Sequence, residues 1–177
     1  MAEVGVTKQV LAYAIKDLMS RQPLAKITVG DICQACGMNR KSFYYHFQDK
    51  YDLVTWIFRG ELAAEIEDNA TLPGMMGALC RTMEKNVAFY RAALREQGQN
   101  SLQEYITAEL LPVIKRALAP HTASIPYADH LSGLYAETCC TCLVRWVQEG
   151  CLIPSAQFLR LLTDAAMTAG KLVGATA

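Results

Sequence analysis

Apolar residues recur every three or four positions along most of this chain of 177 residues, and that spacing is the period of an α-helix. The sequence contains no strand-like alternation of useful length, internal repeat or low-complexity tract. The first apolar stripe ends before Pro23 and comprises Val10, Leu11, Ala14, Ile15 and Leu18. The pattern therefore predicts an all-α protein whose opening helix packs against the segment that follows.

The segment from residue 28 to 50, TVGDICQACGMNRKSFYYHFQDK, predicts two short helices joined by a sharp turn. Thr28 suits the N-cap of the first helix because its hydroxyl can accept a hydrogen bond from an unpaired backbone N–H, and the Asp31 carboxylate favours the positive end of the dipole. Gly37 supplies the left-handed or close-packed backbone that the turn requires. The buried face of this helix is expected to consist of Val29, Ile32, Cys33 and Cys36.

The second helix of the pair is expected to start after an Asn39 cap and to bury Phe43 and Phe47, which are four residues apart. Its other side chains are hydrogen-bond donors and aromatic rings, on a helix short enough to lie in a DNA major groove. These side chains are Arg40, Lys41, Ser42, Tyr44, Tyr45 and His46.

The run ITVGDICQACGMNRKSFYYHFQDKYDLV resembles the DNA-binding domain of the TetR family of transcription regulators. That family's signature is a helix-turn-helix with an aromatic-rich second helix, a Tyr-x-x-Phe pair and a following Lys, and Tyr44, Phe47 and Lys50 fill those places. The resemblance implies a three-helix DNA-binding domain over residues 1–50 and a helical regulatory and dimerisation domain over residues 51–177. It also implies a homodimer that reads a near-palindromic operator in double-stranded DNA.

The residues expected to contact DNA lie at the starts and on the outer faces of the two helices and at the start of the helix that follows them. Arg40 and Lys41 open the second helix, where side chains reach base edges or flanking phosphates. By the family pattern Tyr44 and Lys50 hold phosphate, and the helix start at Thr28 can do the same. The full set is Thr28, Arg40, Lys41, Ser42, Tyr44, Tyr45, His46 and Lys50.

Charge is unevenly spread although the formal net charge is zero. Residues 1–50 carry seven basic and four acidic residues, a net charge of +3, and the remainder carries ten basic and thirteen acidic residues, a net charge of −3. A positive end on an acidic body suits a protein that docks on DNA with that end, although ordinary enzymes show similar differences. A polar amino terminus and the lack of an apolar run of about 20 residues predict a cytoplasmic protein.

The rest of the chain is expected to form further helices. Asp49 should cap a helix that begins at Lys50 and connects the two domains. The expected elements are this connecting helix up to Pro73-Gly74, a helix over 75–97, a turn over 98–101, shorter helices over 102–119 broken or entered at Pro112, a loop over 120–126, and helices over 127–150 and 155–170.

The last two expected helices are apolar on more than one face, so each must be buried on two sides. Either a four-helix homodimer interface or an ordinary intramolecular core would satisfy this, and the pattern leaves both open. The TetR resemblance implies the dimer.

The order of motifs from Phe89 to Ile106, FYRAALREQGQNSLQEYI, resembles the TetR-like regulators of dihydroxyacetone kinase operons, some of which are activators. Members of the wider family bind a small molecule among the body helices. The candidates here are aromatic side chains that could equally be core residues: Trp56, Phe89, Tyr90, Tyr105 and Tyr135. The signal could instead arrive through a partner protein.

Other function classes have less support. The seven cysteines include a Cys33-x-x-Cys36 pair, but a zinc site needs about four ligands and no second pair stands nearby, so thiols and no metal or cofactor are expected. Packing is also expected for Cys139, Cys140, Cys142 and Cys151, with oxidant sensing as the alternative. The histidines are far apart and no phosphate loop or framed nucleophile is present, so no enzyme is predicted. An adaptor that keeps the helix-turn-helix only as a scaffold would be favoured if the Arg40/Lys41 face were occluded.

Overall fold

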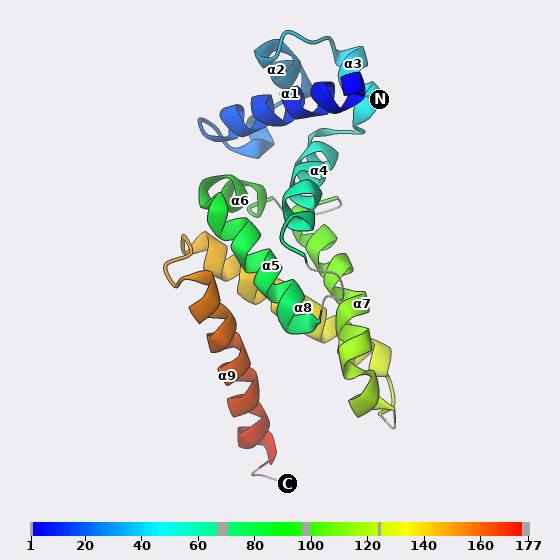
Figure 1. Ribbon diagram of the computed structural model, residues 1–177, viewed down its shortest axis with the longest axis vertical. Coiled ribbons are helices and arrows are strands. Elements are labelled where there is room, and N and C mark those ends of the chain that lie inside the picture. Colours follow the sequence, from blue (N-terminus) through cyan, green and yellow to red (C-terminus); the bar gives the residue numbers. More distant parts are fainter. Residues whose placement is uncertain (1, 67–70, 97–99, 124, 175–177) are drawn as a thin grey trace.

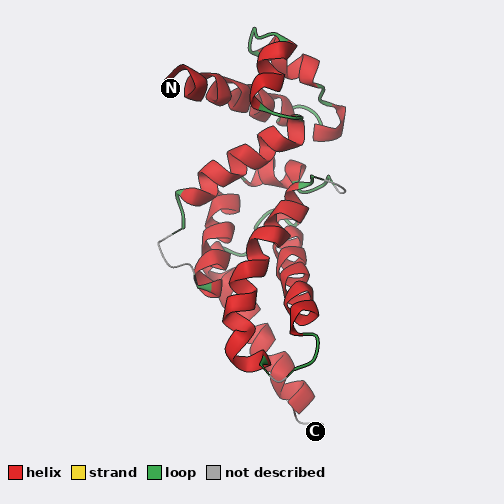
Figure 2. Cartoon of the chain, turned by 90° about the vertical axis from the view of Figure 1, so that its right-hand side faces the viewer, coloured by secondary structure: helices red, strands yellow, loops and turns green. Residues whose placement is uncertain are grey.

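The computed structural model describes residues 2–66, 71–96, 100–123 and 125–174, and within these ranges the chain forms helices and no strand (Figures 1 and 2). This confirms the all-α prediction. The elements in chain order are α1 (Ala2–Met19), the 3₁₀ turn η1 (Leu24–Lys26), α2 (Val29–Ala35), α3 (Arg40–His46), α4 (Lys50–Ala63), α5 (Leu72–Lys85), α6 (Val87–Ala93), α7 (Leu102–Thr122), α8 (Ala128–Gln148) and α9 (Ser155–Gly174).

Helices α1, α2 and α3 pack together at one end of the molecule, and the carboxyl end of α9 lies at the other (Figure 1). The predicted stripe on α1 faces inward, since Leu11 and Ile15 are fully buried. They meet Ile32 of α2 and Phe43 of α3, which are also fully buried, in one apolar cluster. Burial of such side chains supplies most of the stability of a small helical unit.

The predicted helix caps are confirmed. Thr28 and Asp31 form a reciprocal capping box at the start of α2, in which each side chain accepts a hydrogen bond from the other residue's backbone N–H. The Asn39 side chain accepts from Ser42 N–H at 2.8 Å, and the Asp49 carboxylate caps α4. These caps explain why such short helices begin where they do.

The body is built from α4 to α9, with α7 and α8 packed side by side and α5 lying across them (Figures 1 and 2). Its core includes Leu79 and Met83 of α5, Ile106 of α7 and Leu143 of α8, none of which is exposed. Near the end of α8 the Trp146 ring stacks on Phe158 of α9, and its indole N–H donates to the Ile153 carbonyl at 2.8 Å.

Several element boundaries differ from the predictions. The Pro73-Gly74 pair does not end the connecting helix, because α4 stops at Ala63 and Pro73 lies in the first turn of α5 after a Thr71 cap. Proline is tolerated there since the first helical N–H groups have no intrahelical partner. The helix expected over 75–97 is divided at Asn86, whose φ of −143° and ψ of 59° are not helical.

Helix α7 is continuous where separate short helices were expected. Pro112 and Pro120 both lie within it, and the loop expected from residue 120 starts only after Thr122. Each proline removes one backbone hydrogen bond, but burial of Leu110 and Ile114 on either side of Pro112 keeps the helix in place. Of the expected turn over 98–101, residues 98 and 99 lie outside the described residues, and Ser101 caps α7.

A single chain buries only the first part of α9, which packs on α5. Phe158 is buried and Leu159 and Leu162 are half-buried, but every residue from 163 to 171 is exposed. The expectation that this helix is covered on two sides is therefore not met within one chain.

The backbone at Gly37 generates the first prediction. Its φ of +67° is the left-handed conformation, so Gly37→Ala should lower the free energy of unfolding by about 1 kcal/mol, because a Cβ is strained there. Gly60 lies inside α4 with open space at its Cβ position, so Gly60→Ala should raise that free energy by about 0.5–1 kcal/mol. Urea denaturation of both variants checks this, and a change of the same sign in both would contradict it.

Candidate nucleic-acid interface

Four residues separate α2 from α3, and the turn is closed by backbone hydrogen bonds. Met38 N–H donates to the Cys33 carbonyl at 2.9 Å, and Gly37 N–H donates to the Gln34 carbonyl at 3.3 Å. This is the pattern in which a left-handed glycine ends a helix, so the predicted role of Gly37 is confirmed. The turn sets the angle at which α3 leaves α2.

Helix α3 has one buried and one exposed face. Phe43 and Phe47 are buried, whereas Tyr44 is 58% exposed and Tyr45 is 79% exposed. Tyrosine side chains that are exposed to this extent leave their rings and hydroxyls available to a partner. We call the exposed set the reading face, and it consists of Arg40, Lys41, Tyr44 and Tyr45, with Ser42 and His46 half-buried beside it. The structure thus brings six of the eight predicted contact residues together on one helix.

The Thr28 side chain is engaged within the protein. Its hydroxyl donates to Asp31 Oδ2 at 2.8 Å and accepts from the Asp31 backbone N–H at 3.1 Å. The hydrogen bonds from Thr28 lower the pKa of Asp31, first through the backbone N–H and then through the hydroxyl. A phosphate at this helix start would therefore meet a carboxylate beside the N–H groups, which weakens the expected role of Thr28.

Arg40 lies back against the start of α2. A Cβ built on Gly30 would come within 2.6 Å of Arg40 Nη2 and 3.4 Å of its Cζ, so the guanidinium occupies space that only a glycine leaves open. It is also close enough to Asp31 to help lower the pKa of that carboxyl. Sequence reasoning missed Gly30, because nothing local indicates that a residue ten positions later packs on it.

Lys50 has a different role in the structure from the one expected. Its ammonium donates to the backbone carbonyls of Leu24 at 2.7 Å, Ala25 at 3.0 Å and Ile27 at 2.9 Å. An ammonium has three N–H donors, and all three are used, so none is left for phosphate. The partners are more than 20 residues away in sequence, and no local pattern could have indicated them.

The five aromatic pocket candidates do not share one cavity. Phe89 and Tyr90 are core residues, and Tyr135 is 48% exposed. Trp56 packs against Phe47 at 5.8 Å between ring centroids. Tyr105 borders a polar hollow of about 400 Å³ whose other lining residues include Asp49, Asp52 and Glu104. Phe89 and Tyr90 belong to the apolar core and Trp56 and Tyr105 pack against it, because large aromatic rings gain free energy from close packing.

The cysteines lie in the interior of the described structure or partly covered by it. Burial raises the pKa of Cys80 to about 12 and the pKa of Cys151 to about 11. Burial also raises the pKa values of Cys33, Cys139 and Cys140. Thiols with raised pKa values are poor nucleophiles, and among the described residues no group of three metal-ligating side chains comes together.

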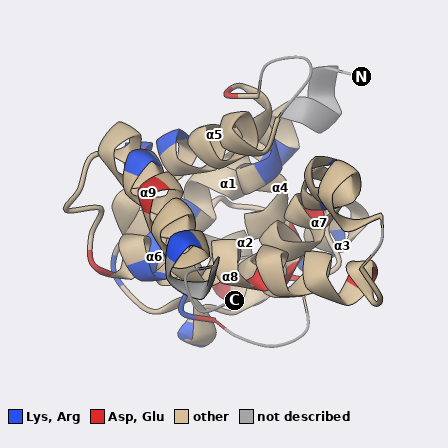
Figure 3. Ribbon diagram, turned by 90° about the horizontal axis from the view of Figure 1, so that it is seen from below, with Lys and Arg blue, Asp and Glu red and all other residues tan. Residues whose placement is uncertain are grey.

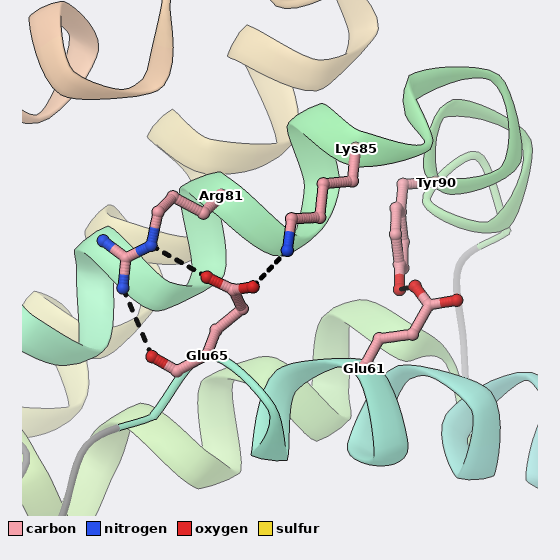
Figure 4. Close-up of polar contacts among 5 residues, drawn as sticks. All are labelled: Glu61, Glu65, Arg81, Lys85 and Tyr90. Atoms are coloured by element: carbon pink, nitrogen blue, oxygen red, sulfur yellow. Dashed lines mark hydrogen bonds and ion pairs between the residues drawn. The ribbon is translucent and has the colours of Figure 1, made fainter.

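Two polar bridges, neither of them predicted, connect α4 to its neighbours. The Glu61 carboxylate accepts hydrogen bonds from the Lys16 ammonium of α1 and from the Tyr90 hydroxyl of α6. Four residues later, just past the end of α4, Glu65 binds Arg81, whose Nε lies 2.9 Å from Glu65 Oε2, and Lys85, both on α5 (Figure 4). Burial raises the pKa of Tyr90, so its hydroxyl stays a donor.

A capped helix-turn-helix with an exposed basic and aromatic helix, mounted on a helical body, defines the DNA-binding class of transcription regulators. Residues 11–55 match the sequence profile described as "Bacterial regulatory proteins, tetR family", and residues 71–168 match the profile described as "Transcriptional regulator C-terminal region". The second match alone covers more than half of the chain. The chain belongs to the TetR family of transcription regulators.

Two curated relatives match part of the chain. The HTH-type dhaKLM operon transcriptional activator DhaS of Lactococcus lactis subsp. lactis (strain IL1403) is 35% identical over 89 residues, which are 49% of this chain and 48% of that protein. The HTH-type transcriptional regulator AcrR of Shigella flexneri is 35% identical over 78 residues, which are 41% of this chain and 35% of that protein. The chain thus aligns with less than half the length of each relative.

Two solved structures share the fold over nearly the whole chain. The dihydroxyacetone kinase operon activator DhaS superposes with a TM-score of 0.63 at 20% identity, covering 94% of this chain and 97% of that one. NalD, the secondary repressor of the MexAB-OprM multidrug efflux pump in Pseudomonas aeruginosa, superposes with a TM-score of 0.66 at 14% identity, covering 94% and 96%. Within the described part of this chain, no helix has the length and apolar character needed to cross a membrane.

The Lys50 contacts generate the second prediction. Lys50→Met keeps the apolar stem but removes three hydrogen bonds to backbone carbonyls, of which that of Leu24 also accepts from Ile27 N–H, so it should lower the free energy of unfolding by about 1–3 kcal/mol. Lys41→Met, at an exposed position on the reading face, should change it by less than about 0.5 kcal/mol. Chemical denaturation measures both, and an unchanged stability for Lys50→Met would return Lys50 to the group of candidate phosphate contacts.

Proposed function

We propose that this regulator binds a specific, near-palindromic operator as a homodimer, with α3 of each chain in a major groove. The observation that carries the proposal is the reading face itself. Its two basic and two tyrosine side chains are exposed on a helix whose start is capped and whose opposite side is anchored by buried Phe43 and Phe47. A rigid helix with exposed donors is what direct readout of base edges requires.

The roles within the reading face follow from position. Arg40 and Lys41 open α3, and Tyr45 is its most exposed aromatic residue, so these three are proposed to reach base edges or the phosphates beside them. Tyr44, Ser42 and His46 are proposed as further donors to phosphate or bases. Arg40 must swing away from Gly30 to reach DNA, which its flexible side chain allows.

The uncovered faces of α8 and α9 support the homodimer. Leu161 and Met167 of α9 are 50% and 60% exposed, and Leu134 of α8 is 61% exposed. Viewed from the α9 end, most of the ribbon carries neither acidic nor basic residues (Figure 3). Apolar helix faces left open in one chain favour burial against a second copy, which would complete a four-helix interface.

The regulated genes are proposed from the relatives. One relative is named as an activator of the dhaKLM operon, and residues 89–106 resemble that subgroup. Together these support control of a dihydroxyacetone kinase operon. The protein would act in the cytoplasm, where the operator would lie, and its function would not be enzymatic. An adaptor would be favoured if the Arg40/Lys41 face were occluded, but within this chain both side chains are exposed.

The third prediction concerns the operator. Selection of bound duplexes from a random pool should yield a near-palindrome with half-sites about one helical turn apart or slightly more. The Arg40→Ala variant should bind the selected duplex about tenfold or more weaker than the wild type does, and its affinity for a scrambled duplex should fall much less. The reason is that a base contact contributes about 1–3 kcal/mol of discrimination. Arg95→Ala, an exposed position in the body, serves as the control and should bind as the wild type does.

Affinities at two salt concentrations decide between specific regulation and the adaptor. If the protein still prefers the selected duplex over the scrambled one at the higher salt concentration, this supports a sequence-specific regulator. Equal, salt-sensitive binding to the selected and the scrambled duplex would contradict sequence-specific regulation and favour the adaptor. If Arg40→Ala weakens binding to both duplexes equally, Arg40 contacts the phosphate backbone and not a base.

The fourth prediction concerns the dimer. Leu134→Glu and Leu161→Glu should each shift the sedimentation mass from twice that of one chain toward that of one chain, because each places a charge in the apolar interface. Tyr13→Glu, at a position on α1 that is 74% exposed, should leave the mass unchanged. A wild-type protein that sediments as a single chain at micromolar concentration would contradict the dimer.

A further inference from the structure

The Arg40 guanidinium lies over the first turn of α2, although Arg40 itself is the first residue of α3. A Cβ on Gly30 would come within 2.6 Å of Arg40 Nη2 and within 3.4 Å of Thr28 Oγ1. Non-bonded heavy atoms do not approach as closely as 2.6 Å, so the guanidinium and a side chain at position 30 exclude each other. We call this volume the space over Gly30.

The backbone of Arg40 is fixed, but its side chain is held only lightly. The Asn39 side chain caps α3 through Ser42 N–H at 2.8 Å, and Phe43 anchors the helix in the core. Within the described part of the chain, the guanidinium forms no hydrogen bond or ion pair. Its N–H donors therefore remain available to a partner, and only the side chain has to move to reach one.

The Asp31 carboxylate supplies the charge that favours the space over Gly30. Its Oδ2 accepts hydrogen bonds from the backbone N–H and the hydroxyl of Thr28, both at 2.8 Å. These bonds are the main reason that the pKa of Asp31 is lowered, and the positive charge of Arg40 lowers that pKa further. An attraction between exposed charges is weak in water, so DNA can draw the guanidinium away.

The space over Gly30 and DNA compete for the same guanidinium. Arg40 must leave the Asp31 carboxylate before it can contact a base or a phosphate, and part of the binding free energy is lost in that step. Glycine is the residue at position 30 that leaves this space open, because its side chain is a single hydrogen atom. A methyl group there would expel the guanidinium and end the competition.

We propose that Gly30 is a positioning residue of the reading face, which holds Arg40 in a rest position off the DNA and thereby lowers the affinity for the operator. Gly30 acts through Arg40, so the inference rests on the proposed role of Arg40 as a DNA contact. The residue at position 30 then sets how tightly the regulator binds, separately from the side chains that read bases.

The first test compares Gly30→Ala with the wild type in DNA binding. The variant should bind the selected duplex about two- to fivefold tighter, which is the range for loss of one competing exposed charge pair. Its affinity for the scrambled duplex should rise by no more than this. Gly60→Ala makes the same chemical change in α4, where the Cβ position is open, and should leave both affinities unchanged.

The same substitution in the Arg40→Ala background separates the proposed mechanism from a direct effect of the methyl group. Gly30→Ala combined with Arg40→Ala should bind as Arg40→Ala does alone, because no guanidinium is left to expel. An equal gain in both backgrounds would overturn the proposal. Unchanged or weaker binding by Gly30→Ala alone would also overturn it. Alanine favours a helix over glycine, so the variant is expected to fold.

The second test needs no DNA and follows the Asp31 carboxyl by NMR titration of the free protein. Gly30→Ala and Arg40→Ala should both raise the pKa of Asp31, because each removes the positive charge beside it, and Gly60→Ala should not. An equal pKa of Asp31 in wild type and Gly30→Ala overturns the inference and leaves the proposed function intact. A wild type without preference for the selected duplex contradicts the proposed function, and the titration together with binding to the scrambled duplex still decides the role of Gly30.

Discussion

One ammonium group ties the DNA-reading domain to the rest of the molecule. Lys50 is the first residue of α4, and its three N–H groups satisfy three carbonyls of the segment that joins α1 to α2. Unpaired carbonyls in a partly buried turn would be costly, and no other side-chain type supplies three donors from one atom. The orientation of α2 and α3 relative to α4 therefore depends on this residue.

Polar contacts bind helix α4 at its start, near its end and just after its end. Lys50 attaches the start of α4 to the helix-turn-helix end, Glu61 near its end bridges α1 and α6, and Glu65, two residues past the end of α4, binds two basic side chains of α5. The helix has 14 residues, so it spans about 21 Å between the reading domain and the body. Through these contacts α1 is joined to α6 by Glu61, and α5 is joined to the segment that follows α4 by Glu65.

The two ends of the molecule differ in how completely one chain buries them. The reading domain closes its own core, since Leu11, Ile15, Ile32 and Phe43 are fully covered. Helix α9 has its first part on α5, and its residues 163–171 are exposed. The DNA-reading end can thus be stable in a single chain, whereas the far end is suited to association.

The sequence by itself determined the helical class, the helix-turn-helix and its caps, because these depend on contacts within four residues, as at Thr28, Gly37 and Asn39. Local rules failed where packing outweighs propensity, as in the continuous α7 through Pro112. Only the tertiary structure decided that Lys50 binds backbone carbonyls and that Glu61 bridges α1 and α6. Those relations join residues about 20 or more positions apart, and their energy comes from burial and charge pairing that exist only in the folded chain.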